Sequence, residues 1–317
     1  MKIVLKNKKV VLFAGGVGGA KLAVGLQEHV PPENLSIIVN TGDDCELFGM
    51  RICPDLDTVM YNLAGIADST KGWGQAKETY RVMQALKSLK APDWFLLGDK
   101  DLGTHLYRTR LLKEGLSLTE VTRNLCSRFG IGCSVLPMTN DPAPTVIHTQ
   151  DGRHLSFQEY FVREGYDPKI KEIELYHGSQ PRASEEVMQS LEQASIIILG
   201  PSNPWVSLDP ILLLPGVKQV LWAKTILGVS GIINGKAIKG PAAKMFKELG
   251  IEPNSLNVMR HYQDLLKGFV IDTTDELDSD KFNQEGIILF RTNTIMKEKR
   301  DKTALAKEVL QFGFSLT

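Results

Sequence analysis

The sequence has little of what marks several classes of protein. It contains four cysteines in 317 residues, and none of them forms a C-x-x-C pair. This scarcity argues against a disulfide framework and against a cysteine-based zinc site. The chain does not open with a charged stretch followed by an apolar one, so we expect a reduced, cytoplasmic protein.

Long apolar runs and an excess of charge of one sign are also lacking. A membrane span needs about 20 consecutive apolar residues, and even the apolar segment 219–233 is interrupted by Lys224 and two glycines. The 37 basic and 37 acidic residues cancel, whereas a protein that coats nucleic acid carries a basic surface. We therefore expect neither a membrane protein nor a nucleic-acid-binding one.

Familiar catalytic patterns are missing too. There is no G-x-S-x-G elbow and no cysteine arrangement typical of a nucleophile. Apart from His105, the histidines show no ligand spacing with one another, so the sequence does not indicate zinc.

What the sequence does have is a glycine-rich loop near its start, in the segment VVLFAGGVGGAKLAVGLQ. An apolar run leads into glycines and then into a helix-like stretch, which predicts a strand, a phosphate-type loop and a helix. Bare amides at a helix N-terminus favour an anion. The candidate anion ligands are Gly15, Gly16, Gly18 and Gly19, with Lys21 as an added positive charge.

This loop departs from the two standard nucleotide-binding patterns. Lys21 stands where G-x-G-x-x-G has its third glycine, and Leu22 replaces the magnesium-binding Ser or Thr of a P-loop. A tight strand-to-helix turn without a ligand is the alternative.

Further apolar runs at 35–40, 93–99 and 195–200 predict strands that end in polar residues. Ligands of open α/β sheets bind outside the carboxyl ends of the strands, so the loops that follow should converge on one crevice. From 142 to 190 the chain is richer in polar and aromatic residues. We predict a Rossmann-like, mostly parallel α/β core (1–141 and 191–317) with an inserted α+β substrate subdomain (142–190).

Acidic residues follow the second predicted strand. Asn40, Asp43 and Asp44 lie where a Rossmann domain places its ribose-binding carboxylate, and two adjacent carboxylates also suit a divalent metal. An Asx-turn would equally explain this stretch. Farther along, Asp55 is expected to cap a helix, and Asp57, in the first turn of that helix, is the better functional candidate.

The densest set of charges follows the third predicted strand. Lys100, His105 and Arg108 lie within one short stretch, and the i, i+3 spacing of His105 and Arg108 places both on one helix face. After the run at 195–200, Ser202 and Asn203 offer a hydroxyl and an amide between two prolines. A solvated helix face and a plain loop are the alternatives for these two segments.

Six segments together resemble the 2-phospho-L-lactate transferase family, called CofD in archaea and FbiA in mycobacteria. They occur in the family's order and span nearly the whole chain: GGVGGAKL, NTGDD, CPDLDTVMYNL, PDWFLLGDKDLGTH, LPMTND and GPSNPWVSLDPILLLPG. The resemblance implies a step of coenzyme F420 synthesis. A guanylylated three-carbon acid transfers its phospho-acid group, phospholactate or phosphoenolpyruvate, to the ribityl hydroxyl of the deazaflavin Fo, and GMP leaves.

The resemblance also implies roles for single residues, Mg²⁺ as the cofactor and a homodimer. Asp57 and Lys100 match the Fo positions, and Asp43 and Asp44 match an acidic pair that we assign to the metal. We expect Asp57, Asp44, Lys100 and His105 to take part in catalysis. The guanosine diphosphate side is assigned to Gly15, Gly16, Gly18, Gly19, Lys21, Asn40, Ser202 and Asn203.

Two other functions compete with this one. A nucleotide-sugar-binding regulatory protein of the YvcK type would share the glycine-loop core without making the cofactor. An NAD-dependent dehydrogenase would share the fold, but it needs the third glycine where Lys21 stands.

Overall fold

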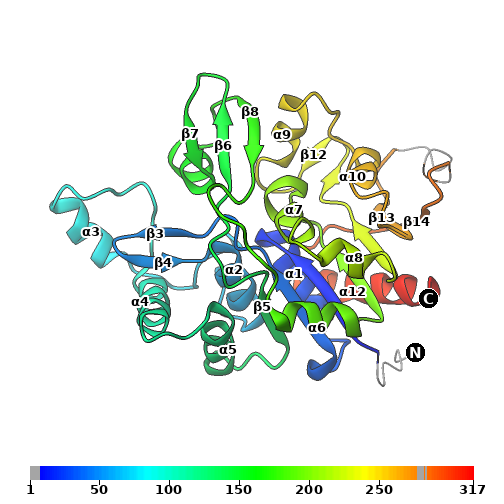
Figure 1. The fold of residues 1–317 in the computed structure, drawn as a ribbon, viewed down its shortest axis with the longest axis horizontal. Helices are drawn as coiled ribbons and strands as arrows, with labels where there is room; N and C mark the ends of the chain where they lie inside the picture. Colours follow the sequence, from blue (N-terminus) through cyan, green and yellow to red (C-terminus); the bar gives the residue numbers. More distant parts are fainter. Residues whose placement is uncertain (1–7, 277–281, 283) are drawn as a thin grey trace.

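The computed structural model describes residues 8–276, 282 and 284–317. Its centre is a seven-stranded sheet in which all neighbouring strands are parallel (Figure 1). The strands, in chain order, are β1 (Val10–Ala14), β2 (Leu35–Val39), β5 (Ser134–Pro137), β9 (Ile196–Leu199), β10 (Ile226–Val229), β13 (Gly268–Asp272) and β14 (Ile288–Thr292).

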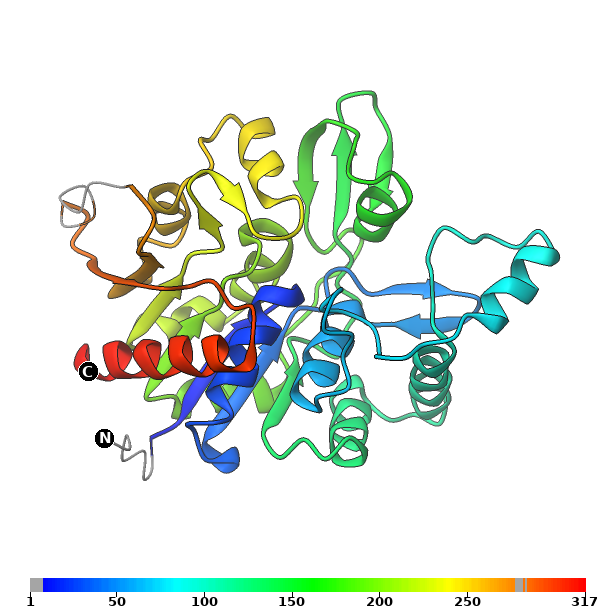
Figure 2. The same cartoon turned by 180° about the vertical axis from the view of Figure 1, so that it is seen from behind.

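Helices cover both faces of this sheet, because its central strands are apolar on both faces. Successive residues of a strand point to opposite faces, and in β1 Val10 and Leu12 join one core cluster while Val11 and Phe13 join the other. The first face is covered by α1 (Gly16–Leu26), α2 (Pro54–Leu63), α5 (Leu118–Arg128) and α12 (Lys299–Ser315). Figure 2 shows α12 and α1 on this side.

The opposite face carries shorter helices. They are α6 (Glu185–Gln193), α7 (Asp209–Leu212), α8 (Val217–Leu221), α9 (Ala242–Glu248) and α10 (Ser255–His261). The order of the sheet is β14-β13-β10-β9-β1-β2-β5. Read from β5, this is the Rossmann order with one strand added. The chain first adds β2 and β5 on one side of β1 and then adds the later strands on the other side, so the strand order reverses between β1 and β9. The predicted Rossmann-like α/β core is thereby confirmed.

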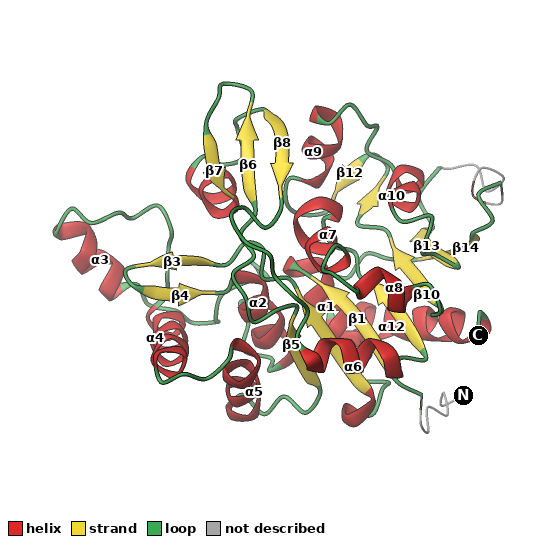
Figure 3. Ribbon diagram, viewed as in Figure 1, coloured by secondary structure: helices red, strands yellow, loops and turns green. Residues whose placement is uncertain are grey.

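Two smaller units project from the core (Figure 3). One is an arm built from the hairpin β3 (Cys45–Leu47) and β4 (Met50–Ile52), with α3 (Arg81–Ser88) and α4 (Asp99–Lys113). The other is an antiparallel sheet in the order β7-β6-β8, formed by β6 (Val146–Thr149), β7 (His154–Ser156) and β8 (Ile170–Glu174). The remaining elements are η1 (Pro32–Asn34), the π-helical turns η2 (Glu159–Arg163) and η3 (Pro204–Leu208), β11 (Ile232–Ile233) and β12 (Lys236–Ala237).

One predicted strand of the core is wrong. Residues 93–98 form no strand, and Asp99 already begins α4. The apolar side chains of this stretch have a different role: Leu97 packs with Met50 and Ile52 in a small core under the arm. The third strand on this side of β1 is β5, and it pairs with β2. A short apolar run looks the same whether it pairs in a sheet or covers a satellite core.

Candidate functional site

A cavity of about 620 Å³ opens at the carboxyl ends of β1 and β9, where the strand order reverses. Its size lies within the range of about 300–1,000 Å³ that is usual for small-molecule sites. It is lined by the glycine loop, by α2 and α4, by η2 of the small sheet unit, and by the segments 201–207, which includes part of η3, and 239–242. The position agrees with the rule that α/β sheets bind ligands where the strand order reverses.

The glycine loop places backbone amides at the edge of this cavity. Gly15 is the extended N-cap residue of α1, Gly16 has a positive φ of 63°, and the first turn carries no acidic residue. The Gly16 amide donates to Oδ1 of Asp55 at 2.5 Å. The Ser202 hydroxyl donates to the Gly15 carbonyl oxygen at 2.8 Å, which fixes the loop against the segment after β9.

Three of the four glycines are required by packing, since a Cβ on Gly15 would lie 2.6 Å from Cβ of Ser207. A Cβ on Gly18 would lie 2.1 Å from the carbonyl oxygen of Pro201, and one on Gly19 would lie 2.8 Å from Cβ of Ala14. Gly15, Gly16 and Gly18 line the cavity, while Gly19 packs behind it. The glycine cluster therefore serves both close packing and access to the amides.

Lys21 does not reach the cavity in this structure. Its ammonium donates to the carbonyl oxygen of Met296 at 2.6 Å. Burial, followed by the nearby charges of Lys239 and Lys302, lowers the pKa of Lys21. Lys21 therefore brings no positive charge to the cavity lining in this structure.

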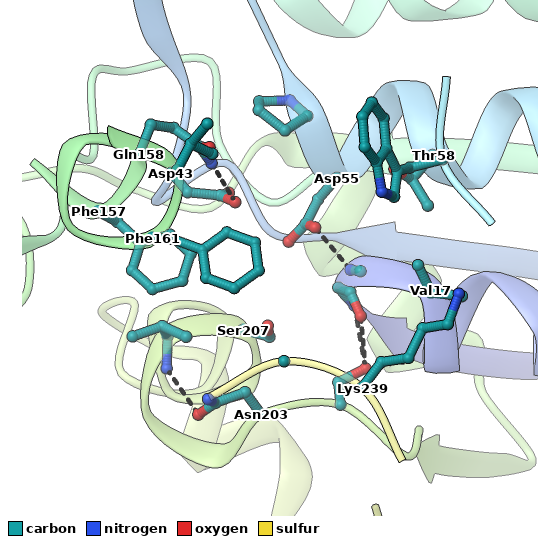
Figure 4. A pocket seen from close by; sticks show the side chains of 18 of the residues that line it. Val17, Asp43, Asp55, Thr58, Phe157, Gln158, Phe161, Asn203, Ser207 and Lys239 are labelled. Carbon is teal, nitrogen blue, oxygen red and sulfur yellow. Dashed lines mark hydrogen bonds between the residues drawn. The ribbon is translucent and has the colours of Figure 1, made fainter. Parts of the chain in front are cut away.

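Two carboxylates, Asp43 and Asp55, point into the same part of the cavity (Figure 4). The Asn40 amide nitrogen lies 2.9 Å from an oxygen of each of them. Gln158 of the small sheet unit donates to the other oxygen of Asp43 at 3.1 Å. Burial raises the pKa of Asp55 to about 6, and burial together with the charge of Asp55 raises the pKa of Asp43 well above its ordinary value.

The structure places the two predicted metal ligands differently. Asp43 lines the cavity, but the side chain of Asp44 is only 2% exposed and pairs with Arg51 at 3.0 Å. Asp55, which the sequence suggested was a helix cap, lines the cavity beside Asp43 instead. Its position directly after Pro54 at the start of α2 aims it back at Gly16. The only sequence signal for this role was a second acid in the turn that contains Asp57.

A charged network forms the other end of the cavity. Arg108, 1% exposed, donates through both terminal nitrogens to the carboxylate of Asp57. Oδ2 of Asp57 lies 3.6 Å from Nδ1 of His105, and Nε2 of His105 lies 3.5 Å from Oδ1 of Asp101. The hydroxyl of Tyr61 donates to the same Asp101 oxygen at 2.5 Å. The network thus joins α2 to α4, although Asp57 and Asp101 lie far apart in the sequence.

Within this network, the arginine fixes the proton position on His105. Nη1 of Arg108 lies 3.1 Å from Nδ1 of His105. A guanidinium has no acceptor, so Nδ1 must accept and the neutral ring carries its proton on Nε2. Nε2 is buried and has no hydrogen-bond partner among the described residues. It lies 3.5 Å from Oδ1 of Asp101, so a ligand oxygen in the cavity would be a second acceptor for this N–H.

Asp57, Asp101 and His105 also have the composition of a metal site, since one ligand atom from each lies within 4.8 Å of the others. The guanidinium of Arg108 contacts both Asp57 and His105, however, and its positive charge opposes a cation at this position. The pair Asp43 and Asp55 fits a divalent cation better.

Of the predicted ligand residues Lys100, Ser202 and Asn203, two lie at the cavity and one does not. Ser202 and Asn203 line the cavity, and the Asn203 side chain also accepts from the amide of Trp205 at 3.1 Å. Lys100 is exposed and lies outside the lining, and its ammonium donates to the carbonyl oxygen of Ala76 at 2.7 Å. Asn40 is fully buried just behind the lining and orients Asp43 and Asp55.

An aromatic wall completes the cavity, and no sequence pattern indicated it. Phe157 and Phe161 stack with ring centroids 5.6 Å apart and an interplanar angle of 4°, and Phe161 stacks on Tyr166 at 5.8 Å. Figure 4 shows the two phenylalanines beside Gln158 and Asp43. The guanidinium of Arg163 lies over the ring of Trp94, 5.7 Å from its centroid, and connects this wall to the segment before α4.

Known proteins match this chain over nearly its full length. The family profile described as 2-phospho-L-lactate transferase CofD matches residues 10–310. The chain belongs to the CofD family. The 2-phospho-L-lactate transferase of Methanosarcina mazei is 36% identical over 95% of this chain and 99% of that protein. The phosphoenolpyruvate transferase of Streptomyces griseus is 34% identical over 96% and 98%.

Membership of the CofD family confirms the resemblance and the assignment as a transferase, and it does not favour the YvcK-type alternative. Among solved structures, a Bacillus halodurans protein described as a member of the UPF0052 family has a TM-score of 0.65 at 17% identity, covering 96% of this chain and 99% of that one. At that identity the likeness shows a shared fold. In the part of the chain that the structure describes, no helix is long and apolar enough to span a bilayer.

Proposed function

We propose that this CofD-family protein transfers a phospholactyl or phosphoenolpyruvyl group from a guanylylated donor to the ribityl hydroxyl of Fo, with release of GMP. The observation that carries the proposal is a single cavity that joins helix-terminal amides, a carboxylate pair and an aromatic wall. These are the three parts that phosphoryl transfer to a flat heterocyclic acceptor needs.

The diphosphate of the donor is assigned to the glycine loop. The N-terminus of α1 and the loop with Ser202 and Asn203 meet there at the carboxyl ends of β1 and β9. Amides at a helix start favour phosphate oxygens. The guanosine then extends along the 201–207 and 239–242 segments that line the same half of the cavity.

The deazaflavin is assigned to the aromatic half. The stacked rings of Phe157 and Phe161 offer a flat apolar surface on which a tricyclic ring can stack. Asp57 and His105 line the same cavity and offer polar contacts to the rest of the molecule. Lys100, which the family resemblance assigns to Fo, would contact Fo only if its side chain moved from the Ala76 carbonyl toward the cavity.

We propose that Mg²⁺ is held by Asp43 and Asp55. The donor set fits a hard cation, because two carboxylates face one space and burial raises the pKa of both, a cost that a cation between them would offset. When bound, the ion would neutralise charge on the diphosphate and on the phosphoryl group in transfer.

In the transfer step, the ribityl oxygen forms a bond to the phosphorus of the phospho-acid group, and the bond from that phosphorus to the GMP oxygen breaks. Both oxygens of Asp57 already accept from Arg108, so Asp57 is suited to orienting the hydroxyl. The His105 N–H is placed to donate to a ligand oxygen, and Asp101 is the nearby carboxylate that can take the hydroxyl proton. Asp44, paired with Arg51 outside the cavity lining, is left out of this step.

We also propose that the protein is a homodimer. Several exposed large apolar side chains belong to the projecting arm, among them Phe48, Val82, Leu89 and Leu106. Light scattering on the purified protein should give twice the chain mass of 35.1 kDa. A monomeric mass would refute this part of the proposal.

Binding of Fo tests the proposed function. Titration of Fo with the protein, followed by its fluorescence, should show saturable binding, and GDP should bind at the same time because the two ligands occupy different halves of the cavity. Asp57→Asn should weaken Fo binding and leave GDP binding unchanged. If the protein does not bind Fo, or if GDP displaces it, the assignment is wrong.

A further inference from the structure

The glycine loop brings no basic side chain of its own into the cavity lining. The carboxylate of Asp55 already accepts a hydrogen bond from the Gly16 amide, and Asp43 lies close by. A diphosphate at the α1 N-terminus would therefore meet two acidic groups. Lys21, the expected counter-charge, is turned toward Met296.

Two lysines lie among the described residues that line the cavity, Lys71 and Lys239. The ammonium of Lys71 donates to the hydroxyl of Tyr80 at 3.0 Å and lies over the rings of Trp73 and Tyr80, at 5.1 and 5.5 Å from their centroids. Its charge is thus already engaged by neighbouring side chains. Lys239 differs, because its ammonium donates to backbone carbonyl oxygens.

Lys239 extends from the loop between β12 and α9 into the lining of the cavity. Its ammonium donates to the carbonyl oxygens of Lys71 at 2.6 Å and Thr70 at 3.4 Å. A Cβ placed on Gly72 would lie 2.7 Å from the Val17 side chain and 3.5 Å from the Lys239 ammonium. The charge therefore lies against the first turn of α1, and Figure 4 shows Lys239 alongside Val17.

We propose that Lys239 binds the diphosphate of the guanylylated donor, exchanging its carbonyl partners for phosphate oxygens. This inference rests on the proposed function and adds the residue that supplies the cation. An ammonium has three N–H donors, and its hydrogen bonds to a charged phosphate are stronger than those to a neutral carbonyl.

The surrounding charges support this role. Lys239 is one of the charges that, after burial, lower the pKa of Lys21. Like charges repel, so the nearby charge of Lys21 makes an anion beside Lys239 more favourable. The part of the cavity beside α1 therefore favours a negatively charged ligand.

The test compares GDP with guanosine in binding calorimetry, using wild type, Lys239→Met and Lys239→Arg. Methionine keeps the length and apolar stem of lysine and removes the charge. Lys239→Met should weaken GDP binding about tenfold or more and leave guanosine binding unchanged. It should also make GDP affinity less sensitive to salt, and Lys239→Arg should restore most of the affinity. Lys236→Met, an exposed lysine on the adjoining β12 outside the cavity lining, is the matched control and should bind GDP as wild type does.

Wild-type GDP affinity in Lys239→Met would overturn the inference and leave the proposed function intact. Equal losses of GDP and guanosine binding would also overturn it, since the side chain would then only support the loop. If the wild-type protein binds neither GDP nor guanosine, the proposed function itself is refuted.

Discussion

Replacing Asp55 with asparagine should make the metal-free protein more stable while removing its response to Mg²⁺. Burial raises the pKa of Asp55 from an ordinary 3.8 to about 6. One pKa unit corresponds to about 1.4 kcal/mol, so ionised Asp55 costs the folded state about 3 kcal/mol at neutral pH. Asparagine removes this cost but loses the hydrogen bond from Asn40, worth about 1 kcal/mol. The expected net gain is about 2 kcal/mol.

The dependence on pH follows from the same carboxyl group. The folded protein holds the Asp55 proton up to about pH 6, whereas the unfolded chain loses it near pH 3.8. Between these values the folded state binds more protons than the unfolded state, so the stability of the metal-free wild type falls as pH rises. Asp55→Asn should flatten this part of the curve.

Urea denaturation with EDTA or with Mg²⁺, from about pH 4 to pH 8, measures both effects. A ligand at about 100 times its Kd adds about 2.7 kcal/mol to the folded state, and this gain should appear in wild type only. Glu46→Gln, which changes an exposed carboxyl on the neighbouring β3, should behave as wild type. An Asp55→Asn protein that is less stable than wild type in EDTA, or equally stabilised by Mg²⁺, would refute the reasoning.

Arg108→Met should destabilise the protein by about 3–5 kcal/mol in urea denaturation, because it leaves the Asp57 charge buried and unpaired. Adding Asp57→Asn should recover part of this loss. If the free-energy changes of the two single variants simply added, Arg108 and Asp57 would not be coupled. Gly18→Ala should weaken GDP binding in calorimetry because its Cβ would lie 2.1 Å from the carbonyl oxygen that follows β9, whereas Gly103→Ala, with open space around its Cβ, should not. Phe161→Ala should weaken Fo binding about tenfold in fluorescence titration, through lost stacking, with GDP affinity as the unchanged reference. Finally, GDP but not NAD should raise the melting temperature, and the reverse would revive the dehydrogenase alternative.

Local sequence patterns were enough to predict the part of the site that is continuous in the chain. An apolar run, a cluster of glycines and a helical pattern in direct succession are typical of a strand-loop-helix unit, and the structure indeed starts α1 at Gly16. The apolar run at 93–98 was ambiguous, because pairing in a sheet and packing onto the arm both require apolar residues. His105 and Arg108 lie on one helix, α4, as their spacing indicated, although no core strand precedes this helix, and α4 brings His105 to the cavity.

Roles that depend on distant contacts could not be predicted. Asp55 and a helix-capping aspartate look alike in sequence, and only the fold shows that its carboxylate lies on Gly16, which is 39 positions earlier. The charge of Asp44 is paired with Arg51 because a hairpin turns between them. Of the two adjacent acids, only Asp43 therefore lines the cavity. The stacked Phe157 and Phe161 come from a separate sheet unit, and no local pattern indicates what they face.

The central claim is the transfer reaction, and its most direct test is product analysis. The protein is incubated with Fo, Mg²⁺ and, in separate reactions, the guanylylated derivative of phospholactate or of phosphoenolpyruvate, and the products are weighed by mass spectrometry. We expect Fo carrying one phospho-acid group, released together with an equal amount of GMP from at least one donor, and neither product with Asp55→Asn. Unmodified Fo with both donors, at protein concentrations that bind Fo and GDP, would contradict the claim.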